Sequence, residues 1–125
     1  MQLSRELPDY AYALRSAGGH QARVNERVLD RSFILAPDTL VEDWPVPTDA
    51  AALQPADLEP VLALQPALVL LGTGEHQVFP PAAVLAHCLA RGIGLEAMSN
   101  DAAARTYSVL AGEGRRVVAA LILAG

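Results

Sequence analysis

The feature that most constrains the fold is a short, uninterrupted apolar run in the middle of the chain. Residues Ala67 to Leu71 are all Ala, Leu or Val, and the run is bounded by Pro66 and Gly72. Such a run is typical of a strand that is covered on both faces, as strands are in a parallel sheet. A parallel partner needs a crossover connection, so we expect a helix and another strand to follow.

The rest of the chain supplies that crossover. Pro80-Pro81 predicts the start of a helix that runs to Arg91 and is closed by Gly92, because proline suits the first helical turn and glycine the position after the last. Its expected inward face consists of Val84, Leu85, Cys88 and Leu89. The elements expected next are a strand over Ile93 to Met98, a helix capped by Ser99 or Asn100 and ended by Gly112, and a final strand over Arg116 to Leu123.

The first third of the chain predicts an antiparallel β meander. The strands expected there are an alternating run through Tyr10, Tyr12 and Leu14, a hairpin of Gln21–Val24 and Arg27–Leu29 around Asn25-Glu26, and an extended run over Ser32–Ala36. The prolines at positions 45, 47 and 55 predict a surface connection, and Asp57 is expected to cap a short helix with Pro60 in its first turn. We therefore predict an α/β fold.

Length and composition set the class of protein. With 125 residues, of which 52% are hydrophobic, the chain fits one domain over residues 1–125 with a sizeable core. The net charge of −5 repels phosphate backbones, so nucleic acid is not expected as a partner. All basic residues are arginine, which excludes a lysine Schiff base.

Location follows from three further observations. The single cysteine, Cys88, cannot form an internal disulfide, which indicates a reducing compartment. Met1 to Asp9 lack the basic start and apolar run of a signal peptide, and no apolar stretch is long enough to cross a bilayer. We expect a cytoplasmic protein without membrane insertion.

A ligand, if there is one, is expected beyond the carboxyl ends of the parallel strands, where Gly72 to Phe79 lie beside Met98 to Thr106. Gly72-Thr73-Gly74 could present backbone N–H groups to an anion, although the rest of a dinucleotide or phosphate-loop motif is missing, so a tight turn is the favoured explanation of the glycines. Arg105 could hold a carboxylate or phosphate, or could be an ordinary solvated helix residue. The candidate ligand-binding residues are Gly72, Thr73, Gly74, His76, Gln77, Asn100 and Arg105.

The sequence offers no catalytic or metal-binding set. His87 and Cys88 are adjacent, so on a helix their side chains point about 100° apart and cannot easily share one ion. Cys88 lies among apolar residues, which predicts a buried neutral thiol instead of a nucleophile. We therefore expect neither a metal nor a cofactor, and His76 is the one plausible base.

Two aromatic residues have alternative interpretations. Trp44 follows Glu42-Asp43 and could be an exposed anchor with an acidic rim at a protein interface, or could cap the core where the meander ends. Tyr107 lies at helical spacing from Ala103 and Leu110, which favours a place in the core.

Several segments together resemble one family. They are Ser32-Phe33-Ile34 with Trp44, Leu71-Gly72-Thr73-Gly74, Gln77-Val78-Phe79-Pro80, Gly92 to Met98, Arg105-Thr106-Tyr107 and Glu113-Gly114-Arg115. In order and spacing they are similar to the family called domain of unknown function 498, over nearly the whole chain. The resemblance implies the three-layer, Mth938-like α/β fold, with a central mixed sheet and helices packed on it, and no established enzymatic activity for most members.

The family includes a mitochondrial complex I assembly factor and an adipogenesis-associated protein. Residues 1 to 15 lack the Arg-rich amphipathic character of a mitochondrial presequence, which favours a bacterial member. Three hypotheses follow: a non-catalytic interaction or assembly domain, a small-molecule or anion-binding domain that could be a cryptic enzyme, and segments that only specify the fold. The partner, the ligand and the oligomeric state are left open.

Overall fold

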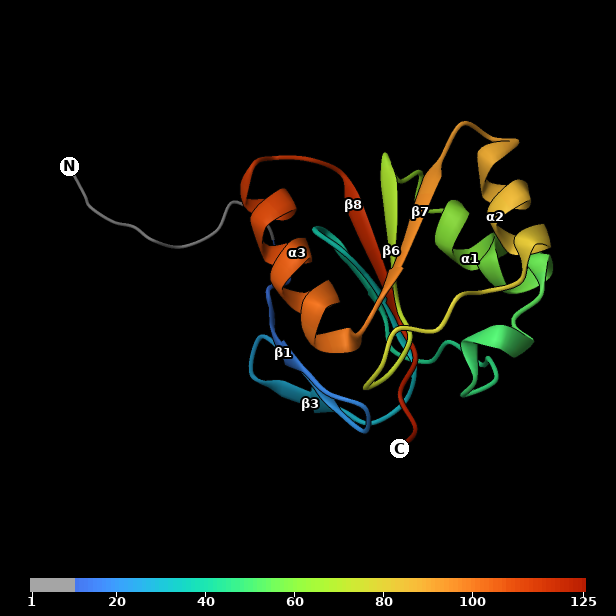
Figure 1. The fold of residues 1–125 in the computed structure, drawn as a ribbon. Coiled ribbons are helices and arrows are strands. Elements are labelled where there is room, and N and C mark those ends of the chain that lie inside the picture. Colours follow the sequence, from blue (N-terminus) through green and yellow to red (C-terminus); the bar gives the residue numbers. More distant parts are fainter. Residues whose placement is uncertain (1–10) are drawn as a thin grey trace.

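The computed structural model describes residues 11–125, and its elements form two sheets, with helices packed on the larger one and one of these helices also in contact with the smaller (Figure 1). The predictions for Met1 to Asp9 and for Tyr10 lie outside the described residues. The strands are β1 (Leu14–Ala17), β2 (Ala22–Val24), β3 (Arg27–Leu29), β4 (Phe33–Ala36), β5 (Thr39–Val41), β6 (Leu68–Gly72), β7 (Gly94–Met98) and β8 (Val117–Leu121). The helices are α1 (Glu59–Leu62), α2 (Ala82–Leu89) and α3 (Asn100–Gly112), with 3₁₀ segments η1 (Ala50–Ala52) and η2 (Pro55–Leu58).

The two sheets differ in how their strands pair. The smaller sheet is the antiparallel meander β1-β2-β3, as predicted, with its hairpin at Asn25 and Glu26. The larger sheet has the order β5-β4-β8-β6-β7. Within it β6 pairs parallel to both β7 and β8, while β4 pairs antiparallel to β8 and β5. The central sheet is therefore mixed, and the fold is the expected α/β class.

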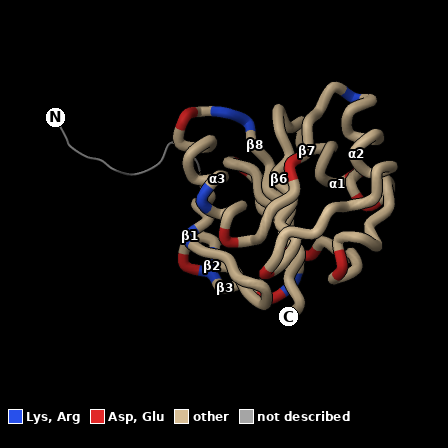
Figure 2. The backbone as a smooth tube through the Cα atoms, in the orientation of Figure 1, with Lys and Arg blue, Asp and Glu red and all other residues tan. Residues whose placement is uncertain are grey.

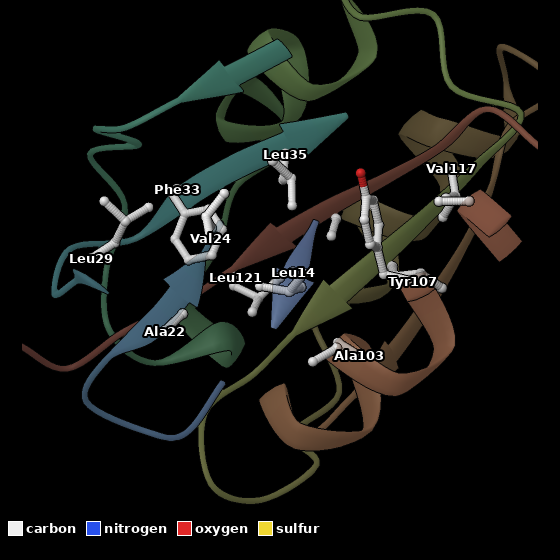
Figure 3. Close-up of a cluster of buried hydrophobic side chains, with 14 of the residues drawn as sticks. Leu14, Ala22, Val24, Leu29, Phe33, Leu35, Ala103, Tyr107, Val117 and Leu121 are labelled. Carbon is white, nitrogen blue, oxygen red and sulfur yellow. The ribbon is translucent and has the colours of Figure 1, made fainter. Parts of the chain in front are cut away.

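The apolar run of β6 lies between two hydrophobic cores because successive side chains of a strand point to opposite faces. Leu70 belongs to the core beneath α3 and the meander, whereas Val69 and Leu71 belong to the core beneath α1 and α2. Figure 3 shows part of the first core, where Tyr107 of α3 and Phe33 of β4 point toward the same cluster. Tyr107 is completely buried, as its spacing predicted.

Several element boundaries differ from the predictions. The first described strand begins at Leu14 and not at Tyr12. The three-residue strand β5, after the turn at Pro37-Asp38, was not predicted. The connection predicted over residues 45 to 55 contains η1, whose Ala50 is buried. Asp57 does not cap α1; its carboxylate accepts the Gln54 N–H at the start of η2.

The helices follow the expected capping chemistry, with one correction at the end of α2. Ser99, not Asn100, caps α3, because its hydroxyl accepts the Ala102 N–H at 3.3 Å. Helix α2 ends at Leu89, and that side chain is 64% exposed, so it does not belong to the inward face formed by Val84 and Cys88. Among residues 11–125, no helix has both the length and the apolar character needed to span a bilayer.

Candidate functional site

The loop after β6 and the start of α3 meet at the carboxyl ends of the parallel strands, where the sequence placed the candidate cleft. Thr73 organises this loop, because its hydroxyl donates to the His76 carbonyl at 2.6 Å and accepts the Val78 N–H at 3.0 Å. Its backbone N–H donates to Met98 at 2.9 Å. Thr73 is therefore fully used in shaping the turn.

Asn100 is a buried tie between three distant segments. Its side-chain amide donates to the carbonyls of Gly18 and Ile122, each at 2.8 Å, and its Oδ1 accepts the Gly74 N–H at 3.2 Å. The side chain is completely buried, so these bonds replace water as its partners. Asn100 thus joins the β1–β2 turn, the chain after β8 and the loop after β6.

Gly72 and Gly74 both lie against Asn100. A Cβ on Gly72 would overlap Asn100 Oδ1 and lie 2.8 Å from Leu121 Cγ, so only glycine lets the asparagine approach. Gly74 has φ +107°, and its N–H already donates to Asn100. The anion contact through this loop stays a prediction; the N–H groups of Thr73 and Gly74 already donate within the protein, to the Met98 carbonyl and to Asn100 Oδ1.

The other predicted site residues lie in different places. His76 is exposed beside the turn, and Gln77 donates through Nε2 to the Ala97 carbonyl of β7 at 2.8 Å. Arg105 points to solvent on α3, where its guanidinium pairs with Asp101 one turn earlier. The structure therefore brings Gly72, Thr73, Gly74 and Asn100 together, places His76 and Gln77 at the rim, and leaves Arg105 away from them.

A shallow pocket of about 310 Å³ lies at these strand ends. Val78 and Ile122 contribute apolar surface to it, and His20, Glu75 and His76 contribute polar groups. His20 Nε2 lies 3.9 Å from a Glu75 carboxylate oxygen, and both side chains are exposed. The remaining lining residues are Gly19, Thr48, Thr73, Gly74 and Ala124.

Sequence reasoning missed His20 and Thr48 at this pocket. They belong to the turn before β2 and to the connection before η1, far from the loop after β6 along the chain. No local pattern connects these segments. The Asn100 side chain holds the turn at Gly18 beside Gly74, and the Ala124 N–H donates to the Gly19 carbonyl at 2.8 Å; together these bonds bring His20 to the pocket.

Trp44 is not an exposed anchor. Its side chain is 2% exposed, and its indole N–H donates to the Asp57 carbonyl at 2.9 Å. The ring packs in the core beneath α1 and α2, so the second interpretation, that Trp44 caps the core, is the correct one.

His87 and Cys88 have separate environments. His87 Nε2 lies 2.5 Å from a Glu59 carboxylate oxygen, and Arg91 binds the same carboxylate at 2.8 Å. These partners hold the pKa of Glu59 below its ordinary value. Cys88 is buried, and burial raises the pKa of its thiol. Within the part of the chain that the structure describes, no three His, Cys, Asp or Glu side chains are placed to hold a metal ion.

The mixed five-stranded sheet, its flanking meander and helices, and a loop closed by Asn100 define a three-layer α/β protein of the Mth938-like class. The chain belongs to the family described as "Protein of unknown function (DUF498/DUF598)", whose model matches residues 14–122. The expected family and fold are thereby confirmed.

Three bacterial proteins represent what this chain is similar to. A Xanthomonas campestris protein solved by NMR is 63% identical, with a TM-score of 0.83 over 100% of this chain and 94% of its own. A Bordetella pertussis protein described as a Mth938-like domain is 29% identical, with a TM-score of 0.82 over 100% of this chain and 94% of its own. The "13 kDa major membrane protein" of Francisella tularensis is 32% identical over 74 residues, which are 59% of this chain and 60% of that protein's length.

Proposed function

We propose that this chain is a non-catalytic protein-interaction domain of the assembly-factor type. The observation that carries the proposal is the free edge of β7, which is the last strand of the large sheet. Phe79, in the loop that touches this edge through Gln77, is 71% exposed, and Leu89, at the end of α2, is 64% exposed. Large apolar side chains beside an open strand edge favour binding of another chain.

Site-specific cross-linking tests the proposal. A photoreactive amino acid is placed at Phe79 in one variant and at Val109 in another, and each variant is expressed in cells of the source organism. Val109 is the matched control because it is 59% exposed but lies on α3. We expect a defined adduct with a protein from position 79 and none from position 109. Equal labelling at both positions, or none at either, contradicts the proposal.

A small-molecule binding function is the second candidate, and the pocket at the strand ends supports it. Its volume is about 310 Å³, which is at the lower end of ligand sites, and it combines apolar walls with two imidazoles and a carboxylate. A metabolite thermal-shift screen tests this candidate, since a ligand at about 100 times its dissociation constant adds about 2.7 kcal/mol to stability. The shift should disappear in His76→Ala and persist in His87→Ala, whose imidazole lies outside the pocket.

We also propose that the protein acts in the cytoplasm. The buried free thiol of Cys88 supports a reducing compartment. Fractionation of cells that express the chain with a C-terminal tag checks this, and recovery with the membrane fraction after a high-salt wash contradicts it.

A further inference from the structure

Along the open edge of β7, on the side opposite β6, some backbone N–H and carbonyl groups have a hydrogen-bond partner among the described residues and others do not. Strand residues alternate in direction, and Met98 turns its carbonyl toward β6, where it accepts the Thr73 N–H. The backbone N–H and carbonyl groups of Ile93, Leu95 and Ala97 therefore point away from β6, toward the open edge of the sheet. Two of their groups are already bonded: the Ile93 N–H donates to Cys88, and the Ala97 carbonyl accepts from Gln77.

The other outward groups have no partner among residues 11–125. They are the N–H and the carbonyl of Leu95, the carbonyl of Ile93 and the N–H of Ala97. An incoming strand must therefore supply two hydrogen-bond donors, for the Ile93 and Leu95 carbonyls, and two acceptors, for the Leu95 and Ala97 N–H groups. The other edge of the large sheet, β5, is only three residues long.

We infer that the occupant of this edge is a second copy of this chain, paired antiparallel with Leu95 opposite Leu95; the inference rests on the proposed interaction function. In this register, the N–H and carbonyl of Leu95 bond to the same groups of the other Leu95. The Ala97 N–H meets the free Ile93 carbonyl, while the two groups already bonded, Ile93 N–H and Ala97 carbonyl, face each other. Every free group finds its complement, and no existing bond is broken.

Charge selects this register over the neighbouring one. Glu96 is the one charged residue of β7, and it gives the acidic position on that strand in Figure 2. A shift that paired Leu95 with Ala97 would set Glu96 opposite Glu96, which is unfavourable. With Leu95 on the two-fold axis, Glu96 lies opposite Gly94, which has no side chain. Nothing inside the fold requires that glycine, since a Cβ on Gly94 would make an ordinary 3.7 Å contact with Leu68.

The exposed apolar side chains are complementary in the same arrangement. Phe79 lies near the carboxyl end of β7, because Gln77 binds Ala97, and Leu89 lies near its amino end, because Ile93 binds Cys88. Antiparallel pairing brings opposite ends together, so Phe79 of each copy faces Leu89 of the other. The two-fold axis makes this contact twice, as a closed dimer requires.

Oligomeric state in solution tests the inference. The purified full-length chain is measured by sedimentation equilibrium from about 10 µM to about 1 mM, because a small interface gives weak association. We expect the mass to rise with concentration from 13.2 kDa to twice that value. Phe79→Asp should weaken the dimer at least ten-fold, and Val109→Asp, a matched exposed residue on α3, should leave it unchanged.

Substitutions at Gly94 test the register. Gly94→Lys places a cation opposite Glu96 of the other copy and Gly94→Glu places an anion there, while both add a side chain at the same point of the fold. We expect the lysine variant to dimerise about ten-fold more tightly than the glutamate variant at low salt. Circular dichroism checks that both are folded; if either is not, Glu96→Gln replaces them, and its dimer affinity should equal that of the unchanged chain, because in this register Glu96 faces no second carboxylate.

The outcomes separate the inference from the proposed function. A monomer at every concentration overturns the second-copy inference, whereas cross-linking of position 79 to a different protein leaves the interaction function standing. Equal affinities of the two Gly94 variants overturn the register. Dimerisation lost equally in the Phe79 and Val109 variants overturns the β7 interface.

Discussion

Gly72 must be glycine because the side chain of Asn100 occupies the space beside it. We predict that Gly72→Ala destabilises the protein by about 1–3 kcal/mol, since the added methyl group displaces Asn100 or Leu121. The measurement is urea unfolding. Gly112→Ala is the matched control: no atom lies within 4 Å of its Cβ, and α3 should gain up to about 1 kcal/mol. Equal effects of the two substitutions would contradict this account of Gly72.

Asn100 should matter more than any exposed amide. Asn100→Ala leaves the buried carbonyl of Ile122 and the N–H of Gly74 without their partners, and we expect a loss of about 2–4 kcal/mol of stability. Gln77→Ala also removes a hydrogen bond donated by a side-chain amide, but this one is exposed, so its effect on stability should stay within about 0.5 kcal/mol. Thermal unfolding of both variants decides the comparison. A small effect at Asn100 would mean that water replaces its bonds.

At the scale of elements, Glu59 joins α1 to α2 through His87 and Arg91. Because the pKa of Glu59 is lowered in the folded chain, its contribution is complete above the ordinary carboxyl value of 4.5 and is lost as the pH falls through the folded pKa. We predict that Glu59→Gln reduces the loss of unfolding free energy between about pH 5 and about pH 3. Urea unfolding across this range measures it, and an unchanged acid dependence would contradict the role of the carboxylate.

The elements that sequence predicted well are those with strong local signals. The apolar run of β6, the proline start of α2 and the serine cap of α3 each depend on neighbours in the chain. The position of Trp44 was left open between two interpretations, and that of Leu89 was predicted wrongly, for the opposite reason. Trp44 packs in the core beneath α1 and α2, where its indole N–H reaches a carbonyl of η2, and Leu89 is exposed although its neighbour Cys88 is buried. Both positions depend on how segments distant in the chain pack.

The candidate site was predicted only in part for the same reason. Strand topology correctly placed the loop after β6 beside the start of α3. It could not reveal that the Asn100 side-chain amide donates to the carbonyls of Gly18 and Ile122, because these hydrogen bonds depend on where the meander and the chain after β8 pack. The pocket residues His20 and Thr48 arrive through the same packing.

At the scale of the whole molecule, the large sheet separates two cores that share its strands. Phe33 and Leu35 point to one core, and Ile34 and Ala36 point to the other. Because β4, β6 and β8 contribute to both cores, opening either core exposes the same strands. We therefore expect the described part of the chain to unfold in one cooperative step.

Cys88 offers a direct measurement of that cooperativity. Its thiol is buried in the core beneath α2, so a reagent reaches it only when the core opens, and burial also raises its pKa, which disfavours the reactive thiolate in the folded chain. We predict that a chromogenic thiol reagent labels the native chain at least about 10³-fold more slowly than the chain in denaturing urea. The rate should rise with urea at the same midpoint as circular dichroism. The control is Cys88→Ala with Leu89→Cys, which moves the thiol to a position 64% exposed and should label at once. Fast labelling of native Cys88, or labelling well before the spectroscopic transition, would mean that α2 detaches from the sheet by itself.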